Sequence, residues 1–400
     1  MSSLVTPDLL DRVRERLAHT SGEPTPATVA AAIRTESGGV LGDTDLLGAL
    51  RVLMTELTGA GPLESLLTEP GVADVLVTAP DQVWVDRGRG LERTAIRFTD
   101  EAAVRRLAQR LALSAGRRLD DAQPWVDGRL RDVGNGSFGV RLHAVLAPVA
   151  QGGTCLSLRV LRPATQGLGP LVAGGAVTEA AHDLLVKIVH ARLAFLVTGG
   201  TGAGKTTLLA ALLGAVDPAE RIVCVEDAAE LAPTHPHVVR LVARAPNVEG
   251  VGEVTVRDLV RQSLRMRPDR IVVGEVRGAE VVDLLTALNT GHDGGAGTVH
   301  ANSPEEVPAR LEALAALGGM DRAALHSQLA AAVQVILHVH RSSSGARRLT
   351  QIGVVTRDAH GHVTIVPAWS QDSGEGPAVD RLHQLCSRRG PVGSVEGVRS

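Results

Sequence analysis

The sequence predicts a mixed α/β chain in which an N-terminal α+β domain precedes a domain built on a mostly parallel sheet. The chain has 400 residues, more than one hydrophobic core usually spans, so two domains are expected. Its 44% apolar and 21% charged residues place it among globular proteins and exclude a disordered chain. Beyond residue 194, short apolar runs alternate with helical patterns, as parallel strands joined by helices do.

The first half is expected to hold a helical extension followed by the α+β domain. Residues 1–42 form the predicted extension, which opens with a capped helix after Thr6-Pro7-Asp8 and continues as a polar tether. The α+β domain is predicted over 43–165. Its patterns indicate, in order, a helix over 43–67, strands over 72–78 and 82–86, and a helix over 99–115.

A linker and a second domain are expected to follow. Two prolines and four glycines between residues 163 and 175 predict a linker at 166–178. The second domain is predicted over 179–370, and the Gly-, Ser- and Arg-rich residues 371–400 are predicted to be a disordered tail. Within the domain we expect strands at 194–198, 221–226 and 270–275, helices after Lys205 and over 254–266 and 280–289, a hairpin of 333–341 with 349–357, and a strand over 362–367.

Charge and cysteine content argue against several classes of protein. A net charge of -3 and only six aromatic residues, three Phe and three Trp, make nucleic acid an unlikely partner. Three cysteines without a C-x-x-C spacing exclude a cysteine-built zinc site. The chain starts without a basic flank and apolar run, and no apolar stretch approaches about 18 residues, so a cytoplasmic location is expected.

Residues 199–206 match the phosphate-loop pattern G-x-x-x-x-G-K-[ST] between an apolar run and a helical pattern. Glycines there let backbone N–H groups surround phosphate oxygens, while Lys205 reaches the outer phosphates and Thr206 can ligate Mg²⁺. Neither of the two lysines follows Asn, so the chain has no N-K-x-D element for guanine and ATP is the expected nucleotide. The predicted binding residues are Gly199, Gly200, Thr201, Gly202, Ala203, Gly204, Lys205, Thr206 and Thr207.

Two glutamates follow predicted strands at the edge where phosphates are expected. Glu226 ends one strand and Glu275 follows another, and a carboxylate there can orient a water or hold the water shell of a metal. Glu226 and Thr206 are therefore the predicted metal residues. His292 and His300 flank a glycine-rich segment, whose spacing alone leaves a loop with satisfied imidazoles or a weak metal site open.

Together these segments resemble the type II/IV secretion ATPase superfamily, most closely the tight-adherence (Tad/CpaF-type) pilus-assembly ATPases. The resemblance runs from about Gly61 to Glu312. It is carried by the ordered strings R-A-P-N-V-E-G at 244–250, R-M-R-P-D-R-I-V-V-G-E-V-R-G at 265–278, T-G-H at 290–292 and H-A-N at 300–302.

The resemblance implies a Walker A loop at 199–206, an acidic "Asp box" at 225–227 and an atypical Walker B. In the last, Gly274 stands where many ATPases place aspartate, and Glu275 is the implied water-activating residue. It further implies a "His box" that couples the γ-phosphate to subunit movement. The implied catalytic set is Glu275, Glu226, Lys205, His292 and His300, with Arg141 and Arg159 of the N-terminal domain reaching the nucleotide.

The same resemblance implies a RecA-like ATPase domain working in a homo-oligomeric ring, expected to be a hexamer. Such a motor would couple ATP turnover to export or pilin assembly, peripherally attached to the cytoplasmic membrane through platform proteins of the inner membrane. Two alternatives stay open from the sequence: a DNA-linked conjugation or partition motor, and a nucleotide-gated assembly scaffold.

Overall fold

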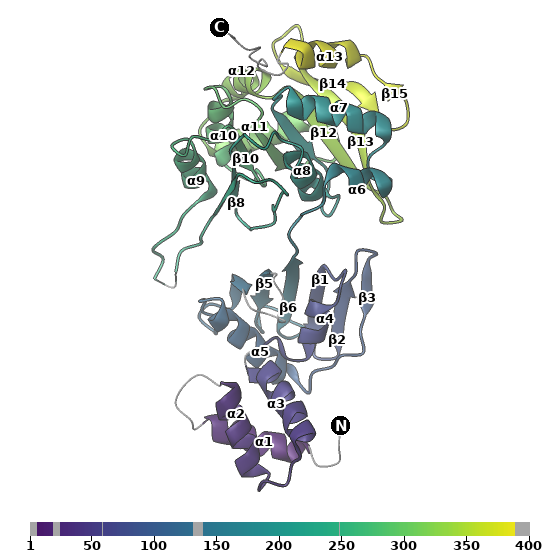
Figure 1. Ribbon diagram of the computed structural model, residues 1–400. Helices are drawn as coiled ribbons and strands as arrows, with labels where there is room; N and C mark the ends of the chain where they lie inside the picture. The colour runs from purple at the N-terminus through teal and green to yellow at the C-terminus, as the bar shows by residue number, and fades with distance from the viewer. Residues whose placement is uncertain (1–5, 19–24, 58, 131–138, 248, 389–400) are drawn as a thin grey trace, which may run out of the picture. The chain divides into compact units, whose positions relative to one another are not determined.

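The computed structural model describes residues 6–18, 25–57, 59–130, 139–247 and 249–388 (Figure 1). The chain divides into two compact units, Met1–Arg162 and Pro163–Ser400. Each unit has its own buried clusters of apolar side chains. Among the helices of the described ranges, none combines the length and the apolar character needed to cross a bilayer.

Three helices at the start of the first unit pack around a small core of their own. They are α1 (Pro7–Ala18), α2 (Pro26–Glu36) and α3 (Asp43–Leu57). The Thr25 side chain accepts the N–H of Thr28, and Pro26 occupies the first turn, which together begin α2. The core is formed by Leu9, Val13, Val29, Ala32, Ile33, Leu46, Ala49 and Leu53. The predicted polar tether thus contains a helix, because Val29, Ala32 and Ile33 give α2 a buried face.

A six-stranded antiparallel sheet, in the order β3-β2-β1-β6-β5-β4, forms the rest of the first unit. Alternate residues of its strands are buried against α4 and α5, so these helices cover one face, and the residues on the other face are half-buried or exposed in β1 and β5. The elements are η1 (Gly61–Leu63), α4 (Glu64–Thr68), β1 (Asp74–Ala79), β2 (Gln82–Asp86), β3 (Leu91–Arg93), α5 (Glu101–Ser114), β4 (Trp125–Leu130), β5 (Gly139–Val145) and β6 (Cys155–Leu161).

The second unit is built on a nine-stranded sheet in the order β15-β14-β13-β12-β7-β11-β10-β8-β9. Its pairs from β12 to β9 are parallel, and those from β12 to β15 are antiparallel. The strands are β7 (Phe195–Thr198), β8 (Ile222–Glu226), β9 (Val238–Val242), β10 (Arg270–Val273), β11 (Ala296–Val299), β12 (Val335–Arg341), β13 (Arg347–Arg357), β14 (Val363–Ser370) and β15 (Gly374–Glu375). The carboxyl ends of β7, β11, β10 and β8 consequently meet at one edge.

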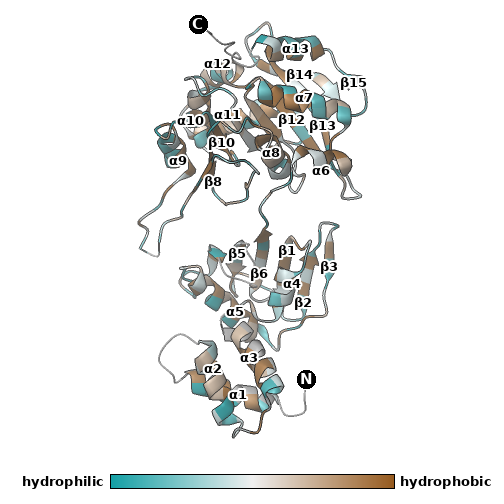
Figure 2. Cartoon of the chain, viewed as in Figure 1, coloured by the Kyte–Doolittle hydropathy of each residue, from teal (hydrophilic) through white to brown (hydrophobic). Residues whose placement is uncertain are grey.

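Helices cover both faces of this sheet, and the brown strands of Figure 2 run between them. One core is shared by α6 (Leu168–Ala173), α7 (Glu179–His190), α8 (Lys205–Leu213) and α13 (Val379–Arg388). The other is shared by α9 (Val256–Ser263), α10 (Glu280–Leu288), α11 (Val307–Leu317) and α12 (Arg322–Ala332), with η2 (Pro304–Glu306) before α11. The central strands are buried on both sides, which explains why they are continuously apolar.

Besides the tether, two segments of the second unit differ from the sequence-based expectation. The predicted linker at 166–178 contains α6, because Leu168 is buried in the core of the second unit. The predicted disordered tail contains β15 and α13, and Leu382 of α13 is completely buried in the same core. Residues 389–400 of that tail lie outside the described residues.

Candidate active site

The glycine-rich loop, residues 199–204, joins β7 to α8. Gly199, Gly202 and Gly204 have φ angles of 150°, 68° and 96°, a range that side chains rarely adopt. A Cβ at Gly199 would lie 2.2 Å from the carbonyl oxygen of Val339 on β12, so no side chain fits there. The loop ends at the start of the nine-residue helix α8, whose free N–H groups and dipole favour a bound anion.

Lys205, the first residue of α8, is folded back over this loop. Its Nζ donates to the carbonyl oxygens of Gly199 and Gly200 at 3.0 and 2.9 Å. The same ammonium lies 3.3 and 3.4 Å from the two ring nitrogens of His300. Burial lowers the pKa of Lys205, and the nearby carboxylate of Glu275 opposes that effect. A cation is thus held where outer phosphates would lie.

Glu275 follows β10 and points toward the same place. Its Oε2 accepts a hydrogen bond of 2.6 Å from Arg277, and its Oε1 lies 2.9 Å from Nε2 of His300 without hydrogen-bond alignment. Burial alone would raise the pKa of Glu275, but the hydrogen bond and charge of Arg277, with His300 and Lys205, hold it below its usual value. The carboxylate is therefore ionised near neutrality and able to accept a proton.

Arg277 is a site residue that the sequence interpretation missed. Besides Glu275, it contacts Asp227, with 3.2 Å between Nη1 and Oδ2, so it joins the acidic segment after β8 to the glutamate after β10. The hydrogen bond to Glu275 raises the pKa of Arg277, with burial opposing it. The sequence Gly274-Glu275-Val276-Arg277 could have indicated this role. A cationic side chain two residues after a strand-end carboxylate is close enough to pair with that carboxylate.

The two histidines of the predicted His box lie apart. His300 follows the carboxyl end of β11 and joins Lys205 and Glu275, and burial and then the Lys205 charge lower its pKa. His292 precedes the amino end of β11, with its Nδ1 3.1 Å from the carbonyl oxygen of Ala287 on α10. The structure therefore does not bring His292 to His300, because the whole of β11 separates them, and a catalytic role of His292 stays a prediction.

Glu226 is the predicted metal residue, but Glu230, which the sequence analysis did not name, is the carboxylate that faces Thr206. Glu226 is 2% exposed and its Oε1 accepts the N–H groups of Glu230 and Leu231 at 3.0 and 2.8 Å. Burial raises the pKa of Glu226 to about 7, although those two hydrogen bonds lower it. The hydroxyl of Thr206 instead faces Glu230, at 3.5 Å from Oε2. Among the described contacts Thr206 thus meets Glu230, and a metal role of Glu226 stays a prediction.

The pair of Thr206 and Glu230 fits Mg²⁺ chemically. Mg²⁺ prefers hard oxygen ligands, and beside phosphates it is usually held by one or two protein groups and several waters. Thr206 and Glu230 offer one hydroxyl and one carboxylate. Among the described residues, no cluster of three or more His, Cys, Asp or Glu side chains could hold a metal by itself.

Arg141 and Arg159 lie in the first unit, on the sheet face opposite the one that packs on α4 and α5. They are direct partners in the register of β5 and β6. Arg141 donates to Asp127 at 2.7 Å and Arg159 donates to Asp74 at 2.9 Å. Their side chains are 39% and 52% exposed. Their contact with a nucleotide stays a prediction.

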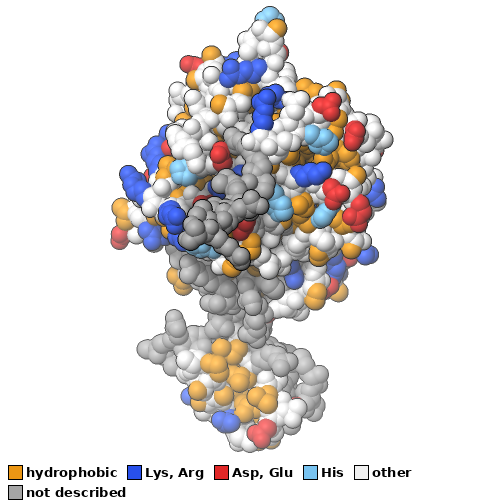
Figure 3. Space-filling view, turned by 45° about the horizontal axis from the view of Figure 1, so that its top comes forward, with side chains coloured by type: hydrophobic (Ala, Val, Ile, Leu, Met, Phe, Trp, Pro, Cys, Tyr) orange, Lys and Arg blue, Asp and Glu red, His pale blue; other side chains and the backbone are white. Residues whose placement is uncertain are grey.

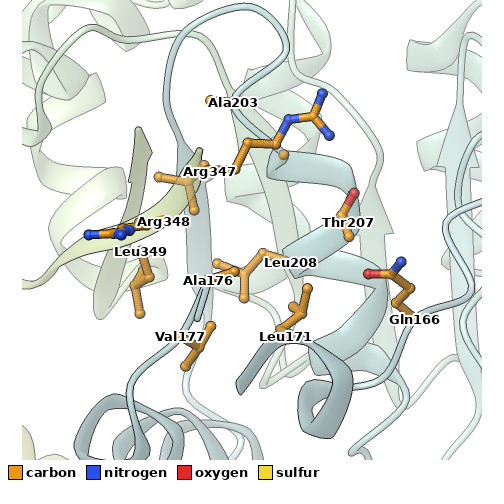
Figure 4. A pocket seen from close by; sticks show the side chains of 12 residues that line it. Gln166, Leu171, Ala176, Val177, Ala203, Thr207, Leu208, Arg347, Arg348 and Leu349 are labelled. Carbon is orange, nitrogen blue, oxygen red and sulfur yellow. The ribbon is translucent and has the colours of Figure 1, made fainter. Parts of the chain in front are cut away.

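A pocket of about 140 Å³ opens beside the glycine loop, where Ala203, Gly204 and Thr207 form part of its wall. Figure 4 shows Leu208 and Ala176 near its middle, with Gln166 and Thr207 together on one side. No carboxylate lines it within the described part of the chain. The complete lining is Gln166, Leu171, Ala176, Val177, Ala203, Gly204, Thr207, Leu208, Val339, Arg347, Arg348 and Leu349. Thr201, at the outer turn of the loop, is exposed.

Comparison with known proteins covers most of the chain. The sequence profile of a family described as "Type II/IV secretion system protein" matches residues 56–365. A putative conjugal transfer protein of Mycobacterium tuberculosis is 72% identical over 350 residues, which span 88% of this chain and 99% of that protein. The type IV secretion system protein PtlH of Bordetella pertussis is 31% identical over 316 residues, covering 72% of this chain and 91% of PtlH.

Solved structures add a likeness of fold. The X-ray structure of the ATPase DotB from Legionella pneumophila matches with a TM-score of 0.50 and 17% sequence identity. The match covers 82% of this chain and 86% of DotB. At that identity the likeness concerns the fold alone.

Proposed function

Because the chain belongs to the family of type II/IV secretion system proteins, we propose that it is an ATPase whose turnover powers a secretion or pilus-assembly system of the tight-adherence kind. The observation that carries the proposal is the meeting of Lys205, Glu275 and His300 beside the glycine loop. A phosphate-binding cation and an ionised carboxylate are the two groups that hydrolysis of a phosphoanhydride most requires.

The residues divide the work of hydrolysis among them. The N–H groups at the start of α8 bind phosphate oxygens, and Lys205 exchanges the carbonyls of Gly199 and Gly200 for the outer phosphates. Glu275, ionised and oriented by Arg277, holds a water in line and accepts its proton. Mg²⁺ when bound neutralises charge on the β- and γ-phosphates, and Thr206 and Glu230 are the residues that would hold it.

The pocket beside the loop is our proposed place for the nucleoside. Thr207 and Leu208 follow the phosphate-binding residues along α8, and both line the pocket. A nucleotide with its outer phosphates at Lys205 would therefore have its α-phosphate and nucleoside on the side of this pocket. Guanine is best recognised by a carboxylate that accepts from its N1 and N2 hydrogens, and the described lining has none. This supports ATP over GTP.

The assembly is part of the proposal as well. We infer a homo-oligomeric ring, a hexamer as the resemblance implies, working at the cytoplasmic face of the membrane with platform proteins of the inner membrane. Arg141 and Arg159, which are cross-strand neighbours in the first unit, are proposed to reach a nucleotide.

The decisive experiment compares phosphate release by the full chain with ATP and GTP, for the wild type and for Lys205→Ala. We expect turnover of ATP, weaker turnover of GTP and loss of both in the variant. Lys187, the chain's other lysine, lies in the last turn of α7, so Lys187→Ala is the matched control. Wild-type turnover by Lys205→Ala would overturn the proposed site.

A second candidate is a DNA-transfer motor, favoured by the name of the mycobacterial relative. Against it, Figure 3 shows basic and acidic side chains interspersed on the visible face of the second unit rather than one basic field. The test is ATP turnover with added double-stranded DNA at rising salt. Stimulation that falls steeply with salt concentration would favour the DNA motor, because phosphate contacts release counterions.

A further inference from the structure

Gly274 lies between Val273, the last residue of β10, and Glu275, and a contact with the neighbouring strand explains why it is glycine. A Cβ at this position would lie 2.7 Å from Cγ and 3.2 Å from Oε1 of Glu226, the last residue of β8. Real Cβ atoms do not approach a neighbour so closely. Gly274 is absent from the glycines with positive φ, so its backbone conformation does not require glycine. The side chain of Glu226 therefore occupies the space that a side chain at position 274 would fill.

The carboxylate of Glu226 closes the turn that follows β8. Its Oε1 accepts the N–H groups of Glu230 and Leu231, four and five residues later. Leu231 is completely buried in the core of the second unit, which anchors the end of the turn. Because both bonds end on one oxygen, the turn is folded over the Glu226 side chain.

This turn decides where Glu230 points. The backbone N–H of Glu230 donates to Glu226, and its carbonyl accepts from the N–H of Ala164 at 2.9 Å. Both backbone polar groups of Glu230 are therefore fixed. Its side chain then lies toward the hydroxyl of Thr206. Glu226 itself is 2% exposed, too deep to meet the solvent around a nucleotide.

We propose that Glu226 is a positioning residue whose side chain lies across Gly274 and folds residues 227–231 so that Glu230 faces Thr206. Position 274 of the atypical Walker B is then glycine because the side chain of Glu226 on β8 needs the space. Glu230, in the turn after β8, supplies the carboxylate that position 274 lacks. This inference rests on the proposed nucleotide site.

A double-mutant cycle on thermal stability tests the contact. Gly274→Ala should lower the Tm by about 3–6 °C through overpacking. In a Glu226→Ala background, which removes Cγ, the same substitution should change the Tm by less than about 1 °C. Gly169→Ala on α6, where a Cβ meets nothing within 4 Å, is the matched control. Additive changes in the cycle would overturn the contact.

Binding of a fluorescent ADP analogue, with and without Mg²⁺, tests the positioning role. Mg²⁺ should raise the affinity for the ADP analogue in the wild type. Glu230→Gln and Glu226→Ala should each reduce that gain in affinity about tenfold, one unit of log affinity. The reduction caused by Glu226→Gln should be at least threefold smaller than that caused by Glu226→Ala, because an amide oxygen still accepts both N–H groups. Equal losses in Glu226→Gln and Glu230→Gln would overturn the proposal, since the charge of Glu226 would then act directly.

The two proposals fail in different ways. A wild-type chain that binds the ADP analogue in neither condition would overturn the proposed function, while the Tm cycle still reports on the contact between Glu226 and Gly274.

Discussion

The two ends of strand β10 carry charged groups with opposite character. At its start, Arg270 is 1% exposed and makes a double ion pair with Glu220, with hydrogen bonds of 2.7 and 3.0 Å. The same guanidinium donates to the carbonyl oxygens of Val189 and Gly294 at 2.8 and 3.4 Å. Each nitrogen of this guanidinium therefore has a partner.

Past the other end of the strand, Glu275 keeps one buried oxygen without a hydrogen-bond partner among the described residues. Lys205 and His300 crowd around Glu275. This difference in hydrogen bonding distinguishes charged residues that stabilise the second unit from charged residues that can act on a ligand. A satisfied ionic network stabilises the sheet, and an incompletely satisfied one is free to bind a ligand.

The largest expected effect is on turnover. Glu275→Gln keeps the shape of the side chain but cannot accept a proton, so kcat for ATP should fall about 10²- to 10⁴-fold. Single-turnover phosphate release checks this, with the Tm measured alongside. An unchanged kcat would end the functional interpretation of this end of the strand.

The next effect is on stability. Arg270→Met removes the double ion pair and leaves Glu220 only its contact with Arg192, 3.3 Å between Nη1 and Oε2. The free energy of unfolding should fall by about 2–4 kcal/mol. Arg322, whose side chain is 63% exposed and pairs with Glu312 at 3.2 Å, is the control, and Arg322→Met should cost only about 0–1 kcal/mol. Urea denaturation of both variants makes the comparison; equal costs would break it.

A pH profile sharpens the comparison at the functional end. Arg277 is a major reason that the pKa of Glu275 lies below its usual value. Removing it in Arg277→Gln should raise that pKa, and because the base acts only when ionised, the acid limb of kcat should move to higher pH. We expect kcat near neutrality to fall about tenfold, with Arg277→Lys retaining part of the activity. An acid limb that stays in place would show that Arg277 does not act through Glu275.

The smallest effect concerns the two histidines on either side of β11. His292→Ala should leave kcat within about twofold and cost about 1 kcal/mol of stability through its bond to Ala287. His300→Ala, beside Lys205 and Glu275, should lower kcat about tenfold or more. Steady-state kinetics and thermal melts of both variants separate these outcomes. A larger loss of kcat in His292→Ala than in His300→Ala would show that the functional residues do not lie at the carboxyl end of β11.

Local spacing was sufficient to predict some parts of the site. The loop at 199–206 is a contiguous motif, and Glu275 follows an apolar strand whose end had to face the phosphates. Both depend on neighbours in sequence and on the rule for parallel sheets. Of the two predicted histidines, only His300 lies beside Lys205 and Glu275. The spacing of eight residues to His292 contains the whole of β11, and the glycine-rich composition of 294–297 does not indicate a strand.

Other features depend on tertiary contacts that no local pattern contains. Glu226 and Glu230 belong to one acidic string, and only the fold of the turn decides which of them meets Thr206. Likewise, the sequence around α13 is polar, and its helix is stabilised by burial of Leu382 in the core that it shares with β14. Composition alone therefore predicted disorder there.

The contact of Gly199 with Val339 also has a practical consequence. The wall of the phosphate loop is completed by β12, and the adjoining pocket by Arg347 and Leu349 of β13. These strands come about 140 residues after the loop in the chain. A fragment cut down to the loop and the strands before it would lose that wall, so the shortest piece able to grip a nucleotide must extend at least through β13.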